Sequence, residues 1–477
     1  MFTPPLTLLE LAHALQSGTL NAEAIVHACV QRIRHHDPKL HMLILDRTEA
    51  ALTEAREVDR RRRDGECLGP LAGLPMTVKD SLDTAGIPTT SACLHRRSYV
   101  PTRDASTVAR LRAEGFILLG KSSLPELAFG VETANLMVGR TRNPWIASHS
   151  VGGSSGGEAA LIATGCSPLG LGTDLGGSLR IPAHFTGVCS LKPGQNILPT
   201  DGNLIRFQTH VLEFASIGPL ASTVTDLALA FAVLHDAPHR RDALLEDAEG
   251  LLDGELPSKP IVHLAFSEDP RLSIPCREAL LHAATVLKAQ DFPVQPHTSE
   301  ALTACETLWD DFIYSDGIAG LYQGLADGEP LEPWKELLRL LVGRARRHPL
   351  PLIVLFLQRH RKPIPLEQTR EGIRRAKELL NTHLPPGGVL LTPVTPHPTR
   401  HWLDMRGLEA SLCYAKPANV LGLTAVTLPI RRGSPGKVPL AVQLMGRAGE
   451  EWRVLSVARA LERGLRRAEG LEAEPGA

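Results

Sequence analysis

The sequence lacks several features that would assign it to a particular class of protein. Basic and acidic residues nearly cancel, with 51 Lys and Arg against 52 Asp and Glu, so no charge excess favours a nucleic acid or another polyanion as partner. No apolar run approaches the roughly 20 residues that span a bilayer, and no basic segment followed by an apolar one is found at the start of the chain. Aromatic residues make up only 4% and hydrophobic residues 43%, as in an ordinary globular enzyme.

Metal-binding and disulfide patterns are missing as well. The eight cysteines form no CxxC pair, and none of the 19 histidines belongs to an HExxH motif. Scattered cysteines in a chain of this size are typical of free thiols in a reducing compartment. The sequence therefore predicts a cytoplasmic protein with no metal site and no disulfide.

The pattern of the chain changes after about residue 68. Before it, a Thr7–Glu10 capping box opens a helix to about Gln16, and two more helices are expected over 22–35, ending before Asp37-Pro38, and over 49–63. After it, short apolar segments alternate with helical ones, which predicts an α/β sheet. Further expectations are a charged linker over 240–259, strands at 389–391 and 438–445 around a helical 410–422, and a frayed tail over 467–477.

Two glycine-rich segments and one lysine are the candidates for chemistry. The segment 172–182 reads GTDLGGSLRIP, and the segment 152–157 reads GGSSGG. Upstream, Lys79 follows the apolar Met76-Thr77-Val78. A serine hydroxyl is a poor nucleophile unless a base takes its proton, and serine–lysine pairs are one solution. This combination predicts acyl transfer, most simply amide hydrolysis.

Ser178 is the expected nucleophile because the glycines beside it leave the backbone open to a substrate carbonyl. The amides of Leu175, Gly176, Gly177 and Ser178 form the predicted oxyanion hole. One such donor typically stabilises the transition state by about 2.7–4 kcal/mol. Asp174 and Arg180 are expected to brace this loop as a partly buried ion pair, without touching the scissile bond.

Lys79 is the expected base. A lysine accepts a proton only when neutral, so burial has to lower its pKa from about 10.4 to roughly 7–8. Ser154 can then relay the proton between Ser178 and Lys79, while Gly153 and Ser155 support the turn that holds it.

Each of these features has an ordinary explanation when taken alone. A Gly-Ser run is more often a linker or a turn, and a single lysine after a strand is usually a surface charge. Their occurrence together in one α/β segment with apolar flanks favours the catalytic interpretation.

At this point the chain resembles the amidase signature family. The matching segments occur in the family's order over nearly the whole chain: 73–80 (GLPMTVKD), 86–90 (GIPTT), 119–121 (LGK) with Glu126, 152–157, 172–182, 191–193 (LKP), 218–220 (GPL) and 439–443 (PLAVQ).

The resemblance implies a triad of Lys79 as base, Ser154 as bridging serine after a cis peptide bond, and Ser178 as nucleophile. It also implies one compact α/β domain with a central mixed sheet covered by helices on both faces, although length alone favours two or three domains. The expected organisation is a helical segment over 1–68 packed on a domain over 69–466, with a motif core at about 73–220 and a helical pocket region at about 260–385.

Within the family, segments 132–144, 180–187 and 338–343 resemble the fatty acid amide hydrolase-like branch. The rival branch is the glutaminase subunit of an amidotransferase complex. Its usual sequence after the Leu-Lys-Pro motif differs from the Gly194-Gln195-Asn196 found here, which disfavours that role.

The sequence thus predicts hydrolysis of a linear carboxylic amide through an acyl-enzyme, without a metal or an organic cofactor. The alternatives are a catalytically silent binding protein on the same scaffold and the glutaminase subunit. The apolar 350–357, with basic residues on both sides, fits a core helix better than a membrane surface. The acyl and amine groups and the oligomeric state are left open.

Overall fold

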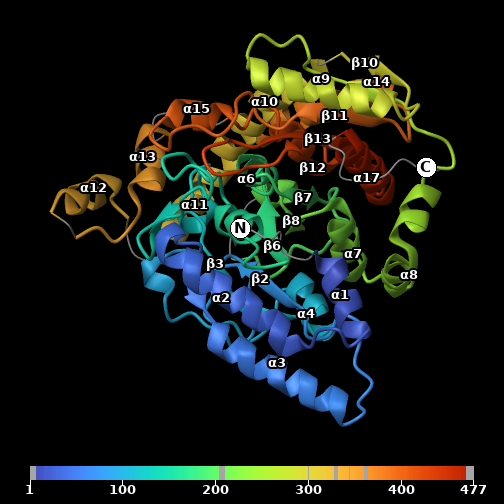
Figure 1. Cartoon of the computed structure of the whole chain (residues 1–477). Helices are drawn as coiled ribbons and strands as arrows, with labels where there is room; N and C mark the ends of the chain where they lie inside the picture. Colours follow the sequence, from blue (N-terminus) through green and yellow to red (C-terminus); the bar gives the residue numbers. More distant parts are fainter. Residues whose placement is uncertain are drawn as a thin grey trace.

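The computed structural model describes residues 7–203, 210–298, 300–326, 331–342, 344–358 and 364–468. An eleven-stranded sheet runs through these residues, and helices cover both of its faces (Figure 1). The predicted α/β fold with a central mixed sheet in one domain is confirmed, so length alone overestimated the number of domains.

The sheet is mixed, because β2 is parallel to β3 and β6, β9 is parallel to β10 and β11, and the remaining pairs are antiparallel. Most of its central strands are buried along their length, as expected where helices cover both faces. A separate ribbon joins β4 (Ala134–Asn135) and β5 (Gly139–Arg140). In sheet order the strands are β1 (Leu43–Asp46), β3 (Ile117–Ser122), β2 (Pro75–Lys79), β6 (Leu169–Asp174), β8 (Ser216–Ala221), β7 (Cys189–Lys192), β12 (Thr424–Arg431), β13 (Leu440–Gly446), β11 (Val389–Pro393), β9 (Val262–Leu264) and β10 (Val294–Pro296).

The α-helices of the described residues are α1 (Leu8–Gln16), α2 (Ala22–Leu40), α3 (Thr48–Arg63), α4 (Ser106–Ala113), α5 (Gly156–Ala163), α6 (Arg180–Thr186), α7 (Val224–Leu234), α8 (Pro238–Gly254), α9 (Ile274–Lys288), α10 (Glu300–Phe312), α11 (Ile318–Ala326), α12 (Pro333–Leu341), α13 (Pro349–Gln358), α14 (Leu366–His383), α15 (Met405–Ala410), α16 (Lys416–Val420) and α17 (Glu451–Ala468). Helices α5 and α6 pack on one face of the sheet, and α7, α9 and α17 pack on the other. The alternation of strand side chains explains this division: Leu220 of β8 packs with α5 and α6, whereas the next residue, Ala221, belongs to the main core.

The N-terminal helices pack against the sheet and its helices, and the predicted capping box is present. The Thr7 amide donates to Glu10 and the Glu10 amide donates to the Thr7 hydroxyl. Helix α2 continues to Leu40, so the prediction that it ends before Asp37-Pro38 is wrong. Pro38 is tolerated in the last turn, and the Asp37 carboxylate accepts the amides of Met42 and Leu43 beyond the helix end. This region also supplies the edge strand β1, so it is not purely helical.

The expected charged linker over 240–259 is mostly the helix α8. Leu244 and Leu252 bury their side chains, and Arg241 pairs with Glu114. The high density of charge concealed the apolar residues of this segment, which bends at Asp247. Leu245, Ala248 and Leu251 also pack against the main core.

The segment 410–422, expected to be helical, is only partly so. It contains the end of α15 and the short α16, with a turn before Pro417. The following strand, β12, was not expected and lies in the middle of the sheet between β7 and β13. Its burial on both faces removes the alternating pattern that would have identified it.

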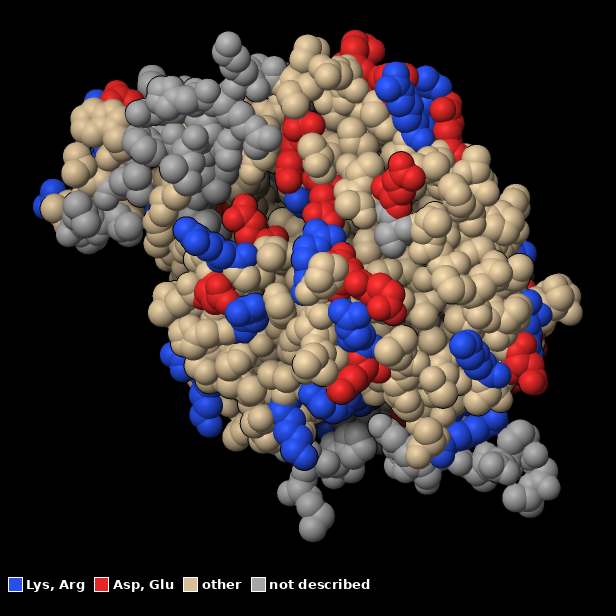
Figure 2. Space-filling view, turned by 90° about the horizontal axis from the view of Figure 1, so that it is seen from above, with Lys and Arg blue, Asp and Glu red and all other residues tan. Residues whose placement is uncertain are grey.

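The apolar segment 350–357 lies in α13, where Leu352 and Leu355 are buried in a cluster with Leu321 and Leu325. Arg359, Arg361 and Lys362, part of its basic flank, fall outside the described residues, as does the tail from residue 469. Among the helices described, none has the length and hydropathy needed to cross a bilayer. On the face in Figure 2, Lys and Arg alternate with Asp and Glu over short distances.

Candidate active site

Lys79 is the last residue of β2, a strand buried along its whole length. Its side chain is fully buried, and its Nζ lies 2.7 Å from Ser154 Oγ, 3.0 Å from Ser155 Oγ and 2.8 Å from Thr173 Oγ1. The first two partners precede α5 and the third lies on β6, so the chain folds three hydroxyls around one amine.

Burial lowers the pKa of Lys79 from 10.5 to about 7. Asp174 and Glu158 act in the opposite direction through their charge, but less strongly. Desolvation penalises the ammonium form, and the hydroxyls beside it carry no charge that would restore it. The amine is therefore available in its neutral form near neutral pH.

Ser154 follows a cis peptide bond from Gly153, as the resemblance implies. The amide of Ser155 donates to the backbone oxygen of Ser178 over 3.1 Å. This bond ties the two glycine-rich segments together, although the bonded residues are 23 positions apart in the sequence.

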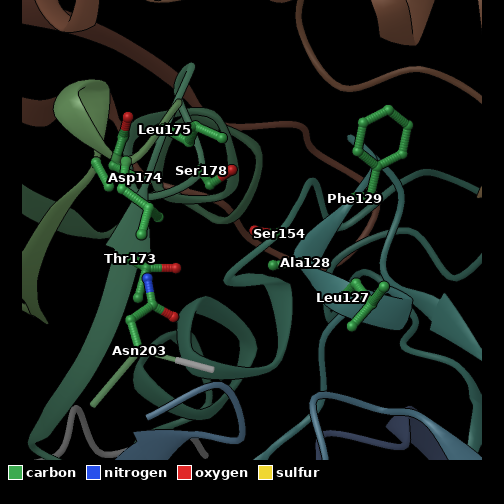
Figure 3. Close-up of a pocket in the computed structure, with 11 residues that line it drawn as sticks. Leu127, Ala128, Phe129, Ser154, Thr173, Asp174, Leu175, Ser178 and Asn203 are labelled. Carbon is green, nitrogen blue, oxygen red and sulfur yellow. The ribbon is translucent and has the colours of Figure 1, made fainter. Parts of the chain in front are cut away.

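Ser178 lies in the turn between β6 and α6. Unlike Ser154 and Ser155, which are buried, it is partly exposed. Ser178 and Ser154 both line a pocket, shown in Figure 3 with Phe129 on the wall opposite Leu175. The structure thus places Lys79 in contact with Ser154, and Ser154 and Ser178 in the lining of one pocket.

The loop before Ser178 presents backbone amides, but not all of those expected. The Gly177 amide donates to Asp174 Oδ1 over 2.8 Å, so it is already engaged. The amides of Leu175, Gly176 and Ser178 have no acceptor among the described residues. Glycine is required at 177, where φ is +122° and a Cβ would lie 2.6 Å from Ala415.

Trp309 of α10 fixes the same loop from the outside. Its Nε1 donates to the Leu175 carbonyl oxygen over 3.0 Å, and a Cβ on Gly176 would lie 2.7 Å from its ring. In a trans peptide the N–H points away from the C=O, so holding the Leu175 carbonyl directs the Gly176 amide to the opposite side. The Nζ of Lys416 lies 4.8 Å from the centroid of the Trp309 ring and forms an ion pair with Asp310 Oδ1 at 2.7 Å.

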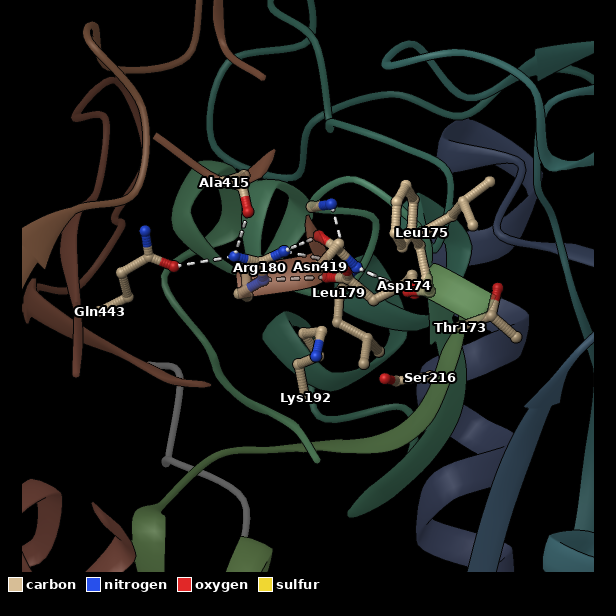
Figure 4. Close-up of polar contacts among 12 residues, drawn as sticks. Thr173, Asp174, Leu175, Leu179, Arg180, Lys192, Ser216, Ala415, Asn419 and Gln443 are labelled. Carbon is tan, nitrogen blue, oxygen red and sulfur yellow. Dashed lines mark hydrogen bonds and ion pairs between the residues drawn. The ribbon is translucent and has the colours of Figure 1, made fainter. Parts of the chain in front are cut away.

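Asp174 and Arg180 form a fully buried, bidentate ion pair, with Arg180 nitrogens 3.0 and 3.1 Å from the two carboxylate oxygens (Figure 4). Burial acts to raise the pKa of Asp174, but the Arg180 guanidinium outweighs it and holds that pKa below its ordinary value. Arg180 also donates to Ala415, Asn419 and Gln443. The pair braces the loop, and it is more deeply buried than expected.

Sequence reasoning missed three contributors to this site. Thr173 was quoted in a motif without a role, and Glu158, which accepts from Thr77 at 2.6 Å, gave no signal apart from its place in an apolar helix. Burial raises the pKa of Glu158 to about 7. Trp309 lies 131 positions after Ser178 in a helix of ordinary composition, so only the fold reveals it.

A group of metal-ligating side chains lies beside the pocket wall formed by Leu127 and Phe129. Ligand atoms of Cys93, His95 and Glu126 lie within 4.8 Å of one another. One Glu126 oxygen accepts the His348 amide over 2.7 Å. The spacing of these residues resembles no metal motif, which is why the sequence did not indicate the group.

With this geometry established, comparison with known proteins identifies the class. The amidase family model matches residues 24–455. The chain therefore belongs to the amidase family, whose members act on amide carbon–nitrogen bonds, and it is an enzyme of that kind.

Three relatives show the range of similarity. The A subunit of the glutamyl-tRNA(Gln) amidotransferase of Nitratidesulfovibrio vulgaris (strain DP4) is 33% identical, over 96% of this chain and 97% of its own. The native peptide amidase of Stenotrophomonas maltophilia is 26% identical, with a TM-score of 0.75 over 96% and 97% of the two chains. A chain of a vestigial protein complex connected with the origins of an s-triazine catabolic enzyme is 25% identical, with a TM-score of 0.79 over 96% and 98%.

The expected likeness to the fatty acid amide hydrolase-like branch is wrong. Curated relatives that match nearly the whole chain include amidotransferase A subunits, another at 32% identity coming from Moorella thermoacetica. The segments used for the branch assignment are short, whereas these alignments span 96% of the chain.

Proposed function

We propose that the protein hydrolyses a carboxylic amide through an acyl-enzyme on Ser178, with Ser154 as relay and Lys79 as base. The observation that carries this proposal is the environment of the Lys79 amine: fully buried, with three hydroxyl oxygens within 3.0 Å, two of them from the serines of one glycine-rich segment.

The hydrogen bonds around Lys79 fit a neutral amine, which has two N–H groups and one lone pair. Ser155 donates its own hydroxyl proton to the Thr173 carbonyl over 3.1 Å, so it accepts a bond from Lys79. Thr173 Oγ1 accepts the second N–H. The lone pair then faces Ser154 at 2.7 Å, in position to take the Ser154 proton.

The reaction follows from this arrangement. Ser178 Oγ attacks the amide carbon while its proton passes to Ser154 and the Ser154 proton passes to Lys79. The relay then runs in reverse and protonates the leaving nitrogen, because an amide anion is a poor leaving group. A water molecule repeats the sequence on the ester, which releases the acid and restores Ser178.

The developing oxyanion is assigned to the amides of Leu175, Gly176 and Ser178. Gly177 was included in the expected set, but its amide stabilises the Asp174 carboxylate instead. Asp174 and Arg180 thus hold the loop in shape, and the amides that remain act on charge that appears only in the transition state.

The second candidate is a glutaminase component of an amidotransferase complex. The comparisons favour this candidate over a free-standing amidase, although the residues after the Leu-Lys-Pro motif disfavoured it, because the chain is 33% identical to an amidotransferase A subunit over 96% of its length. The same triad chemistry on glutamine would release ammonia for a partner. Glutamine-specific hydrolysis together with co-purification of a second subunit supports this candidate, whereas turnover of simple amides by the isolated chain supports the first.

The role of Ser178 is tested by Ser178→Ala, with the exposed Ser98→Ala as a matched control. Turnover of an amide panel and covalent labelling by a sulfonyl fluoride are measured together. Ser178→Ala should lose both, by at least about 10⁴-fold in rate, while Ser98→Ala retains both. Labelling that survives in Ser178→Ala refutes the assignment, and an unlabelled, inactive wild type favours a binding protein.

A further inference from the structure

The pocket that contains Ser178 is apolar on most of its surface. Its non-polar lining comes from Leu127, Ala128, Phe129, Leu175, Leu212 and Ala215. The polar lining residues are Ser154, Thr173, Asp174, Ser178 and Asn203. A pocket of this kind selects its ligand through its few polar groups, because apolar contacts discriminate weakly between groups of similar size.

Most of these polar groups are already used. The Thr173 hydroxyl accepts from Lys79. The Asp174 oxygens accept from Arg180, from Asn419 and from the amides of Gly177 and Leu179. Ser154 and Ser178 belong to the proposed relay, so Asn203 is the remaining polar side chain in the described lining.

Asn203 is 5% exposed, and its Oδ1 is buried without a hydrogen-bond partner among the described residues. Figure 3 shows its amide below Thr173, on the side of the pocket across from Leu127, with the oxygen directed towards the space between the two walls. Its backbone is held in place, since it bridges Leu82 and the preceding Gly202 accepts the Asp83 amide over 2.8 Å.

A buried acceptor without a partner costs roughly 1–3 kcal/mol, and such groups are rare in native proteins. At this position a ligand can satisfy it. The requirement is a hydrogen-bond donor carried by the substrate, placed a few bonds away from the carbonyl that Ser178 attacks.

We propose that Asn203 forms a substrate subsite, and that the preferred substrate is an uncharged amide with a hydroxyl or amide N–H donor besides the scissile group. This inference rests on the proposed function and deepens it. Asn203 acts as a specificity residue that touches substrate without taking part in proton transfer.

The described lining of the pocket has little net charge, which favours an uncharged substrate. Among the described lining residues, Asp174 is the only ionisable one, and Arg180 neutralises it at 3.0 Å. The α-ammonium and α-carboxylate of glutamine would therefore find no charged partner among the described lining residues, which is costly in an apolar environment.

The test compares amides that differ only by a hydroxyl or a methyl group at one position. The pairs are lactamide and isobutyramide, 3-hydroxypropanamide and butyramide, and 4-hydroxybutyramide and valeramide, with glutamine as the charged probe. The wild type should prefer the hydroxyl member of at least one pair by about tenfold or more in kcat/KM, and should use glutamine less well than that member.

The variant Asn203→Leu should remove this preference, because the hydroxyl member loses its acceptor and its kcat/KM falls to about that of the methyl member. Asn203→Asp, which keeps the acceptor oxygens, should retain the preference. Asn381→Leu makes the same change on the exposed side of α14 and should alter nothing. Asn203→Ser is the second variant if leucine prevents folding, since its hydroxyl is too short to reach.

The outcomes separate the two proposals. Equal use of both members of every pair by the wild type, or a preference that survives in Asn203→Leu, overturns the subsite but leaves the hydrolase intact. Efficient use of glutamine alone overturns the subsite and favours the glutaminase. Failure of the wild type to hydrolyse any amide overturns the proposed function and the subsite with it.

Discussion

Lys79 and Lys192 are both fully buried, and burial lowers the pKa of each from 10.5 to about 7. Their partners differ. Lys79 faces three hydroxyls, whereas Lys192 donates to the carbonyl oxygens of Pro193 and Leu423 over 3.0 and 2.8 Å. A carbonyl oxygen only accepts hydrogen bonds, but a hydroxyl can also give up its proton. Burial favours the neutral form of both amines, and the neighbouring atoms decide whether such an amine can act as a base.

The largest effect that tests this comparison comes from removing each amine. Lys79→Met should lower kcat/KM by about 10³-fold or more, because the proton from Ser178 loses its acceptor. Lys192→Met should change kcat by less than about fivefold, but should lower the free energy of unfolding by roughly 1–3 kcal/mol, because the buried Leu423 carbonyl loses its Lys192 donor. The Pro193 carbonyl keeps the bond from the Ser216 hydroxyl. Amide hydrolysis and urea unfolding of both variants measure these effects; a matching loss of activity in Lys192→Met contradicts the distinction.

The pH dependence of kcat/KM is a second way to distinguish Lys79 from Lys192. Lys79 must be neutral to act, and its pKa is lowered to about 7. Activity should therefore rise with pH up to about 7 and level off above it, falling by about tenfold for each unit below. The profile of kcat/KM for an uncharged amide measures this midpoint. Lys192→Met should leave the midpoint in place, and a wild-type profile that is flat from pH 5 to 8 would falsify the role of Lys79.

A smaller effect is expected from Trp309, which acts on the oxyanion loop through one hydrogen bond. Trp309→Phe keeps a ring over Gly176 but loses the bond to the Leu175 carbonyl, so kcat should fall by about tenfold with KM nearly unchanged. Trp145 is the matched control, because its Nε1 also donates to a backbone carbonyl, that of Thr186, over 2.7 Å. Trp145→Phe should cost stability without this loss in kcat, and equal kcat values for the two variants contradict the positioning role.

Local patterns predicted much of the secondary structure. The Thr7 capping box gave α1 correctly, and the apolar segments before Lys79 and Ser178 proved to be β2 and β6. Errors arose where tertiary contacts overrode local signals. The charged residues of α8 concealed two buried leucines, and β12 is buried on both faces and so lacks alternation.

The sequence also predicted much of the candidate site, but not the contacts of its backbone amides. Motif spacing identified Lys79, Ser154 and Ser178, and the structure places the first two in contact and the third in the same pocket. Nothing in the sequence showed that Gly177 gives its amide to Asp174. Whether a backbone N–H is free depends on which side chain turns towards it, and residue types do not reveal that.

The sequence by itself determined the kinds of chemical group available: hydroxyls on flexible glycine-rich turns, a lysine in an apolar strand, and an acid–base pair on either side of the nucleophile. Those properties depend on neighbours along the chain. The tertiary structure alone decided the contacts of those groups: three hydroxyls at one amine, Trp309 at the Leu175 carbonyl, and no hydrogen-bond partner for Asn203 Oδ1 among the described residues. Hydrogen bonds act over about 3 Å, and only folding brings residues 75 to 134 positions apart within that distance.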